Sequence, residues 1–305
     1  MGASSTSAKK PSPASRPSAR ASARSVSPGE RGLGLATLKD LARRHGVRPT
    51  KALGQHFLAD PNLARAIAAD AGIREDDRVV EVGAGLGSLT VALAAAGGRV
   101  LAVEFDRTLL PALREVVEPW PRVEVRAADA MRMDWARALP GDGWKMVSNL
   151  PYNIAVPLVV GMLEEVPAIR TYLVMVQREV GERLVAGPGD PAYGAVSVRV
   201  GYRAEGALAR RVPASVFWPR PSVDSVLVRL ERRSRPAVAT DPGRLFRVVD
   251  EGFAERRKTM RNALRRLGLS ASQAASALER CGLEPNVRAE RLTIHDFARL
   301  AEAVG

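Results

Sequence analysis

The chain has 305 residues, of which 46% are hydrophobic and 26% are charged. These are globular values, and the length suffices for one large domain and a smaller one. Lys and Arg number 46 against 33 Asp and Glu, giving a net charge of +13, which indicates a polyanionic partner, either nucleic acid or an anionic membrane surface. No apolar run reaches the roughly 18 residues of a membrane span, so we expect no membrane partner.

The Cys and His content excludes two kinds of site. Cys281 is the single cysteine, so the chain cannot form an internal disulfide, and a reducing, cytoplasmic location fits. The three histidines, His45, His56 and His295, are scattered and lack the spacing of a metal-ligand cluster. We therefore expect no metal.

Composition divides the chain into three parts. Residues 1–32 are mainly Ser, Ala, Pro, Arg and Lys and predict a disordered basic tail, which either binds RNA nonspecifically or is a solvated extension. Residues 33–231 alternate strand-like and helix-like segments, which is typical of a parallel sheet covered by helices. Residues 232–305 follow an expected linker at Arg232–Pro236 and carry only helical periodicity.

The alternating part predicts a doubly wound, mostly parallel, Rossmann-like α/β sheet of seven strands, followed by a small all-helical C-terminal domain. Strands are expected over 78–82, 99–104, 122–127, 144–149, 171–177, 207–213 and 225–230. Helices are expected over 35–45, 62–71 and 88–96.

A glycine-rich turn follows the first predicted strand. Gly83 and Gly85 let the backbone approach a ligand closely at a helix N-terminus. Glu104 ends the next strand 21 residues after Gly83, where a carboxylate accepts hydrogen bonds from both ribose hydroxyls of a nucleoside. Dinucleotides and S-adenosylmethionine share these features. Glu81, two residues before the turn, favours S-adenosylmethionine because an acid repels a pyrophosphate and attracts a sulfonium.

Two further positions complete the predicted site. Asp129, after the third strand, either accepts a hydrogen bond from the adenine amine of the donor or caps a helix that begins near Ala130. Ser148–Asn153 is either a strand with a proline turn or a site for a planar amine. In the second case the Asn149 side-chain oxygen and the Leu150 carbonyl accept the amine protons, Pro151 kinks the backbone, and Tyr152 stacks on the flipped base.

These motifs, together, resemble the KsgA/RsmA family of ribosomal RNA adenine dimethyltransferases over roughly residues 51–300. The motifs that carry the resemblance are Leu53–Leu58, Glu81–Gly87, Val103–Asp106, Asp129–Met131, Asn149–Asn153, Gln177–Val180 and Phe217–Pro221. The resemblance implies a methyltransferase domain at 33–231 and S-adenosylmethionine as the cofactor. It places donor contacts on His56, Leu58, Gly83, Glu104, Asp129 and Asn149, and we add Gly85.

Two residues bear on this resemblance. The family usually has Asn where this chain has His56, whose imidazole still donates or accepts a hydrogen bond; without the family, it is read as a capping or packing residue. Phe217 corresponds to a second aromatic clamp on the target base, although the prolines that follow it also suit a loop anchor buried under the sheet.

The C-terminal part carries a basic stretch, Arg256–Leu264, similar to that of the small-subunit enzymes. We expect one helix on which Arg257, Arg261 and Arg265 form a stripe, with Arg256 and Lys258 beside it. Between Arg229 and Arg266 there are twelve basic and five acidic residues, a local excess of +7. The stripe is either a solvated face or, as we favour, a set of RNA phosphate contacts in an RNA-binding domain at 232–305.

The resemblance thus implies dimethylation of the N6 amines of two adjacent adenines near the 3′ end of small-subunit rRNA, in an assembling 30S-type particle. We expect a cytoplasmic monomer. Two alternatives remain at this point: a large-subunit rRNA adenine methylase of the macrolide-resistance type, and a noncatalytic ribosome assembly factor.

Overall fold

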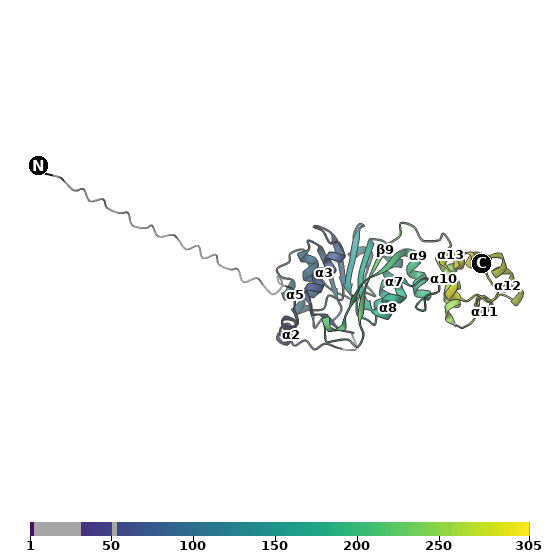
Figure 1. Cartoon of the computed structure of the whole chain (residues 1–305), viewed down its shortest axis with the longest axis horizontal. Helices are drawn as coiled ribbons and strands as arrows, with labels where there is room; N and C mark the ends of the chain where they lie inside the picture. The colour runs from purple at the N-terminus through teal and green to yellow at the C-terminus, as the bar shows by residue number, and fades with distance from the viewer. Residues whose placement is uncertain (3–31, 51–53, 256, 305) are drawn as a thin grey trace.

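The strands form one mixed sheet whose central members are parallel. A computed structural model describes residues 1–2, 32–50, 54–255 and 257–304 (Figure 1). In these residues a seven-stranded sheet has the order β4-β3-β2-β5-β6-β9-β7, with β9 and β7 antiparallel to their neighbours. The strands are β2 (Arg78–Val82), β3 (Arg99–Glu104), β4 (Val123–Ala127), β5 (Trp144–Asn149), β6 (Ile169–Gln177), β7 (Ala204–Val212) and β9 (Ser225–Arg232). The predicted fold class is confirmed.

Helices cover both faces of the sheet because successive strand residues point to opposite sides. Val79 faces a core shared with α2 (Leu35–Arg44), α3 (Pro61–Asp70), α4 (Ser88–Ala95) and α5 (Leu110–Val117). Its neighbour Val80 faces a second core shared with α6 (Trp135–Ala138), α7 (Ala155–Glu165), α8 (Arg178–Val185) and α9 (Ala195–Arg203). Because both faces of the sheet are buried, the sequences of the central strands are mostly apolar.

A second, two-stranded sheet ties the N-terminal part to the segment before β9. Strands β1 (Phe57–Leu58) and β8 (Phe217–Trp218) pair antiparallel. The main-chain amide of Ala59 also donates to the Val216 carbonyl at 2.8 Å. Residues 54–58 are thereby held beside the carboxyl edge of the main sheet.

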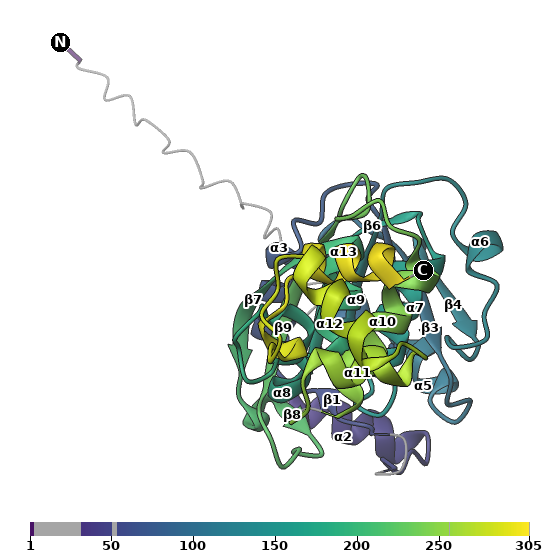
Figure 2. The same cartoon turned by 90° about the vertical axis from the view of Figure 1, so that its right-hand side faces the viewer.

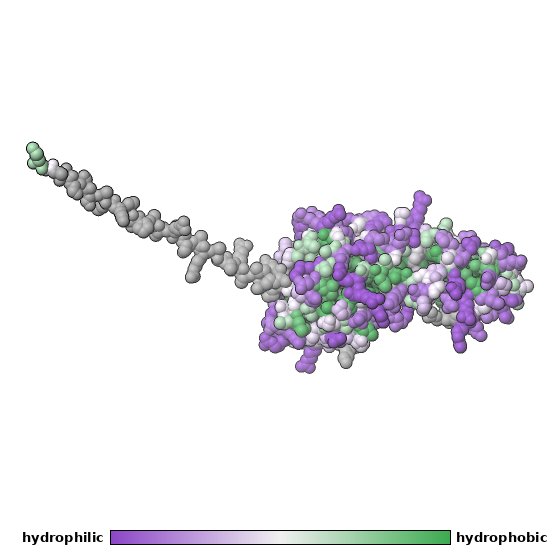
Figure 3. All heavy atoms as spheres, viewed as in Figure 1, coloured by the Kyte–Doolittle hydropathy of each residue, from purple (hydrophilic) through white to green (hydrophobic). Residues whose placement is uncertain are grey.

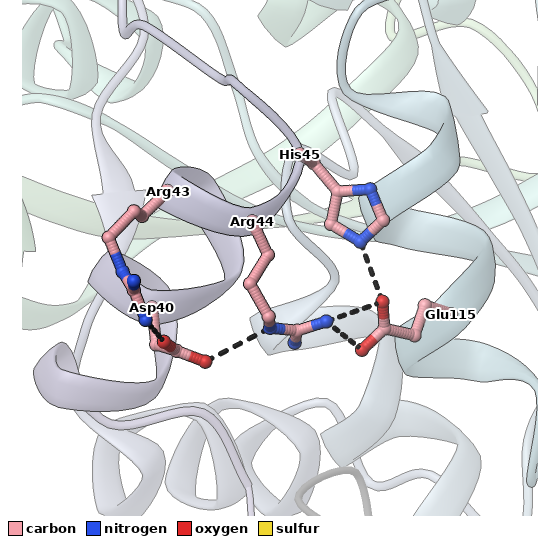
Figure 4. Close-up of polar contacts among 5 residues, drawn as sticks. All are labelled: Asp40, Arg43, Arg44, His45 and Glu115. Atoms are coloured by element: carbon pink, nitrogen blue, oxygen red, sulfur yellow. Dashed lines mark hydrogen bonds and ion pairs between the residues drawn. The ribbon is translucent and has the colours of Figure 1, made fainter.

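Ion pairs fix α2 against α5 on the outside of the molecule (Figure 4). Arg44 lies 2.8 Å from Glu115, and His45 Nε2 lies 2.6 Å from the same carboxylate. Hydrogen bonds from His45 and then Arg44 hold the pKa of the Glu115 carboxyl below its usual range. Asp40 bonds Arg43 and Arg44 in turn. Because these groups are partly exposed, they orient α2 more than they stabilise it.

The C-terminal helices pack on α9 at the end of the molecule away from α2 and α3 (Figures 1 and 2). They are α10 (Pro242–Ala254), α11 (Met260–Arg266), α12 (Ala271–Arg280) and α13 (Ile294–Val304). Their core also contains Tyr193, Val198 and Tyr202, so the segment at 193–202 serves two cores. Arg232, predicted to open a linker, is instead the last residue of β9.

The single helix predicted to carry the arginine stripe is wrong. Helix α10 ends at Ala254 and α11 begins at Met260, so Arg257 does not share a helix with Arg261. The interruption lets Met260 turn inward, where it is fully buried against Gly252. Its amide donates to the Val287 carbonyl at 2.8 Å. The Met260 amide therefore bonds to a distant residue, Val287, where a continuous helix would have bonded it to the residue four positions earlier.

The side chain of Arg232 links the end of β9 to the C-terminal end of α7. Its guanidinium donates to the carbonyls of Met162, Leu163, Val166 and Ile169 at 2.7–3.0 Å, so it caps the C-terminal end of α7. Arg232→Ala removes these four hydrogen bonds, although the Met162 carbonyl keeps the Val166 amide and the Tyr172 hydroxyl, and the Val166 carbonyl keeps the Ile169 amide. We expect a loss of about 2–4 kcal/mol in the free energy of unfolding, measured by urea denaturation. Exposed Arg235→Ala is the control and should change it by less than about 0.5 kcal/mol. Equal losses in both variants would contradict the capping role.

Candidate active site

One cavity, of about 260 Å³, opens at the carboxyl edge of the sheet. This lies near the lower end of the range for small-molecule sites, and the edge is where open α/β sheets bind ligands. The walls come from five segments that are distant in sequence: residues 54–58, 81–89, 103–109, 128–131 and 149–154. The fold therefore gathers the predicted donor and acceptor motifs around one space.

The glycine-rich turn and Glu104 form one wall of the cavity. Gly83 and Gly85 have positive φ angles of 77° and 58°, and an added Cβ at Gly83 would lie 3.0 Å from Pro151 Cδ. Buried Glu104 accepts hydrogen bonds from the amides of Gly85 and Asp106, both at 2.8 Å. Burial raises the pKa of Glu104 above its ordinary value. These two amides fix the orientation of the Glu104 carboxyl at the cavity wall.

Glu81 is the most deeply buried acid at the site, with 1% of its surface exposed. Its Oε2 atom accepts a hydrogen bond from Thr90 Oγ1 at 2.6 Å. Burial, and then the charge of Glu104, raise its pKa to about 8. Glu81 is therefore not a fixed anion, as its sequence position suggests, but a carboxyl that ionises when a cation compensates for the burial.

Asp129 starts a turn and not a helix. Its Oδ1 atom accepts a hydrogen bond from the Met131 amide at 2.9 Å, and the next helix begins at Trp135 with Asp134 as its cap. The alternative in which Asp129 caps a helix at Ala130 is therefore wrong. Asp129 lines the cavity with Phe105 and Met131, whose side chains are exposed by 61% and 46%. The two apolar side chains provide a surface for a planar ring.

Asn149 is oriented by the N-terminal segment. Its Nδ2 atom donates to the main-chain carbonyl of His56 at 2.9 Å, which turns the other arm of the carboxamide, Oδ1, into the arm available to a ligand. None of the hydrogen bonds between described residues goes to Oδ1. Leu150 and Pro151 continue along the cavity wall, and the Leu150 amide donates to the Met175 carbonyl.

Of the two aromatic residues predicted to hold the base, Tyr152 lies at the cavity and Phe217 does not. Tyr152 lines the cavity, and its hydroxyl lies 2.8 Å from Ser225 Oγ; burial raises its pKa. Phe217, predicted as a second clamp, is only 4% exposed, belongs to the core and does not line the cavity. Its pairing with Leu58 in the two-stranded sheet draws its ring inward, which matches the alternative of a loop anchor. His56 and Leu58 do reach the cavity.

Three polar residues at or beside this cavity were missed from the sequence. Ser88, the first residue of α4, lines the cavity, is 6% exposed and has a hydroxyl without a partner among the described residues. Gln55 Nε2 donates to Asp106 at 2.7 Å. Ser225 contacts Tyr152 across 73 residues of chain. The place of Ser88 directly after the glycine-rich turn could have identified it as a site residue. No neighbouring sequence feature indicates that Ser225 contacts Tyr152.

The chemistry of the donor set suits a cationic nucleoside. Two buried carboxyl groups, Glu81 and Glu104, stand beside the glycine-rich turn. A cationic ligand favours their ionised forms, whereas a pyrophosphate disfavours them. Glu104 suits ribose hydroxyls, and the partnerless Ser88 hydroxyl suits a polar group at the other end of the ligand. S-adenosylmethionine, with a ribose, a sulfonium and an amino acid group, matches this set.

No metal cluster is formed by the His, Cys, Asp and Glu residues in the described part of the chain. In the same residues, no helix has the length and apolar character that a membrane crossing requires. Arg257, Lys258, Arg261 and Arg265 are exposed at the C-terminal end, far from the cavity in the chain, and Arg256 lies outside the described residues. The predicted tail at 1–32 lies almost wholly outside them as well.

Comparisons with known proteins agree with this geometry. A family model described as ribosomal RNA adenine dimethylase matches residues 47–304. The chain is similar to ribosomal RNA small subunit methyltransferase A of Streptomyces avermitilis, with 47% identity over 90% of this chain and 94% of the relative. The Streptomyces coelicolor protein of that name is 48% identical, over 88% and 96%.

Two solved structures have the same fold. A dimethyladenosine transferase from Plasmodium falciparum aligns with a TM-score of 0.69 and 24% identity, covering 80% of this chain and 96% of that one. The 23S rRNA methyltransferase ErmE aligns with a TM-score of 0.63 and 26% identity, covering 81% and 99%.

The buried Glu81 carboxyl predicts a pH dependence of stability. The folded protein keeps this proton up to a pH of about 8, whereas the unfolded chain loses it near the ordinary pKa of 4.5. The folded state therefore binds more protons between these values, and its stability falls as pH rises through this window. Glu81→Gln removes this loss. In urea denaturation of ligand-free protein, its stability relative to wild type should rise by roughly 1–4 kcal/mol from pH 5 to pH 8.

The matched control is Glu118→Gln, which changes an exposed glutamate outside the cavity. Its stability should follow wild type at every pH. A Glu81→Gln variant that also runs parallel to wild type would show that Glu81 is ionised in the folded protein.

Proposed function

Since the chain belongs to the ribosomal RNA adenine dimethylase family, we propose that it dimethylates the N6 amines of two adjacent adenines near the 3′ end of small-subunit rRNA. S-adenosylmethionine is the methyl donor. The observation that carries the proposal is the Asn149 carboxamide, turned by the His56 carbonyl toward the space that the donor residues enclose. The small-subunit target is supported by relatives of 47–48% identity whose names state it.

The acceptor amine is a weak nucleophile because its lone pair is delocalised into the adenine ring. Asn149 Oδ1 and the Leu150 carbonyl accept its two protons, which holds the lone pair toward the methyl group. Tyr152 stacks on the flipped base and fixes its plane. When bound, S-adenosylmethionine supplies a methyl group made electrophilic by its sulfonium. The transfer needs no covalent enzyme nucleophile, and the contribution of these residues is orientation.

The donor residues act at fixed atoms. Glu104 accepts the ribose hydroxyls, Asp129 the adenine amine, and Gly83 and Gly85 admit the backbone close to the ligand. Glu81 carries its proton until the cationic donor arrives, because burial penalises the free carboxylate. The positive charge of the donor thus offsets the cost of burying an ionised Glu81, a cost that the ligand-free protein avoids by keeping Glu81 protonated.

The RNA partner is held at the C-terminal end of the protein. Arg257, Lys258, Arg261 and Arg265 are exposed there, and hydrophilic side chains project from this end in the view of Figure 3. We assign them to phosphate contacts in an assembling small subunit, with residues 232–305 as the RNA-binding part and 33–231 as the methyltransferase part. The protein acts as a cytoplasmic monomer in this proposal.

Methyl transfer onto purified undermethylated small subunits, with the modified nucleotides mapped, tests the proposal. We expect dimethyladenosine at two adjacent adenines near the 3′ end with wild-type protein. Asn149→Ala should bind S-adenosylhomocysteine within about threefold of wild type yet lose at least about 100-fold in transfer rate, because the amine loses its acceptor. Methylation of large-subunit rRNA instead, or no transfer by wild-type protein, would refute the proposed target or activity.

The RNA-contact residues give a separate expectation. Replacing both Arg261 and Arg265 by Ala should weaken binding to small subunits and reduce the slope of log affinity against log salt by about 2, one for each lost phosphate contact. The control replaces exposed Lys39 and Arg43 on α2, at the opposite end of the molecule (Figure 1). It removes the same charge. An equal change in slope for both pairs would mean that net charge, and not this surface, binds the RNA.

A further inference from the structure

We infer that His56 and Ser225 hold the ring of Tyr152 in position for the acceptor base, and that the His56 side chain serves the acceptor and not the methyl donor. The inference rests on the proposed function, because it takes Tyr152 as the residue that stacks on the adenine. Family resemblance suggests the opposite assignment, a donor contact at position 56.

Ser225 fixes the far end of the Tyr152 ring. The two hydroxyl oxygens lie 2.8 Å apart. Ser225 is 1% exposed and is the first residue of β9, where it pairs with Gln177 of β6 and with Val212 of β7. A strand with neighbours on both sides cannot shift easily. The hydroxyl of Tyr152 is therefore attached to the rigid sheet, while its backbone follows the irregular Leu150–Pro151 segment.

His56 supports the same ring from its side. The ring centroids of His56 and Tyr152 are 5.4 Å apart, at an interplanar angle of 33°. A base inserted between two rings needs them about 7 Å apart, twice the contact distance of stacked atoms. The His56 ring therefore does not share the base with Tyr152 as a second clamp. It packs against Tyr152 and leaves the remaining ring surface at the cavity for the base.

The side chain and the main-chain carbonyl of His56 both form hydrogen bonds with residues near the proposed acceptor position. The Nδ1 atom of His56 lies 2.7 Å from the Pro219 carbonyl, and because a carbonyl only accepts, Nδ1 carries the proton. The main-chain carbonyl of the same residue accepts from Asn149 Nδ2 at 2.9 Å. One residue thus orients the amine acceptor through its backbone and the stacking ring through its side chain. An Asn at this position would keep the first contact and lose the ring contact.

The segment between β8 and β9 has a role that follows from these contacts. It supplies the Pro219 carbonyl to His56, and it leads directly into Ser225, the first residue of β9, whose hydroxyl contacts Tyr152. Phe217, buried in the core at its start, anchors this segment. The aromatic residue of the motif thereby affects the base through Tyr152 and without touching it.

The test separates donor binding from methyl transfer. His56→Asn, His56→Phe and Ser225→Ala are compared by calorimetric binding of S-adenosylhomocysteine and by single-turnover transfer onto undermethylated small subunits. All three should bind S-adenosylhomocysteine within about twofold of wild type. His56→Asn and Ser225→Ala should lower the transfer rate roughly three- to tenfold, the size of one aromatic contact or one hydrogen bond. His56→Phe, which keeps a flat ring, should retain more of the rate than His56→Asn.

A double-mutant cycle shows whether the effect passes through Tyr152. In a Tyr152→Phe background the hydroxyl is absent, so Ser225→Ala should cause no further loss of rate. In a Tyr152→Ala background, His56→Asn should cause none. Tyr152→Phe removes the same hydrogen bond from the more accessible partner, so the comparison stands even if Ser225→Ala folds poorly.

The outcomes are distinct. Weaker binding of S-adenosylhomocysteine by His56→Phe, whose ring has no hydrogen-bonding group, would make His56 a donor ligand and overturn the inference. Additive losses in the cycle would do the same for the coupling to Tyr152. Failure of wild-type protein to methylate small subunits would instead refute the proposed function, since it does not depend on either variant.

Discussion

The hydrogen bond from Asn149 Nδ2 to the His56 carbonyl is the contact on which the rest of the site depends. Asn149 ends β5, so its position is set by the sheet, but a carboxamide at a strand end can rotate. The two-stranded sheet of β1 and β8 brings the His56 carbonyl to it, which selects the orientation with the oxygen toward the ligand. A short pairing between distant segments thereby determines which atom of the Asn149 carboxamide remains available at the cavity.

Burial of acids near that contact sets the electrostatics of the donor side. Glu81 and Glu104 are both nearly inaccessible to solvent. Burial raises the pKa of both carboxyls, and the charge of Glu104 raises the pKa of Glu81 further. Glu104 gains two amide donors, whereas Glu81 gains one hydroxyl. The unequal support explains why Glu81 holds its proton to about pH 8. A cation in the cavity changes that balance, which a pyrophosphate cannot do.

Local pattern was sufficient for the sheet and for most of the donor site. Strands β2, β3 and β5 begin and end at the predicted residues, because apolar runs bounded by turns report burial on two faces. The glycine-rich turn, Glu104 and Asn149 follow from their places at strand ends. What could not be predicted depends on contacts between distant residues: the pairing of β1 with β8, the choice between the two positions expected for Phe217, and the contact of Ser225 with Tyr152.

The interruption between α10 and α11 also depends on contacts between distant residues, and the sequence pattern did not predict it. Helical periodicity runs through residues 242–266, yet the buried side chain of Met260 and its amide bond to Val287 end that continuity. As a result, Arg257 and Lys258 lie on a turn and Arg261 and Arg265 on α11. The basic surface predicted from spacing is therefore built from two elements in place of one, with α10 contributing its apolar face to the core.

The central claim is that Asn149 Oδ1 holds the acceptor amine in the same cavity as the methyl donor. A crystal structure of the protein with S-adenosylhomocysteine and an RNA fragment containing the two adenines tests it most directly. We predict a distance of about 3 Å between Asn149 Oδ1 and an adenine N6 atom, with Asn149 Nδ2 still donating to the His56 carbonyl. An ordered adenine in the cavity whose N6 contacts neither Asn149 nor the Leu150 carbonyl would contradict it.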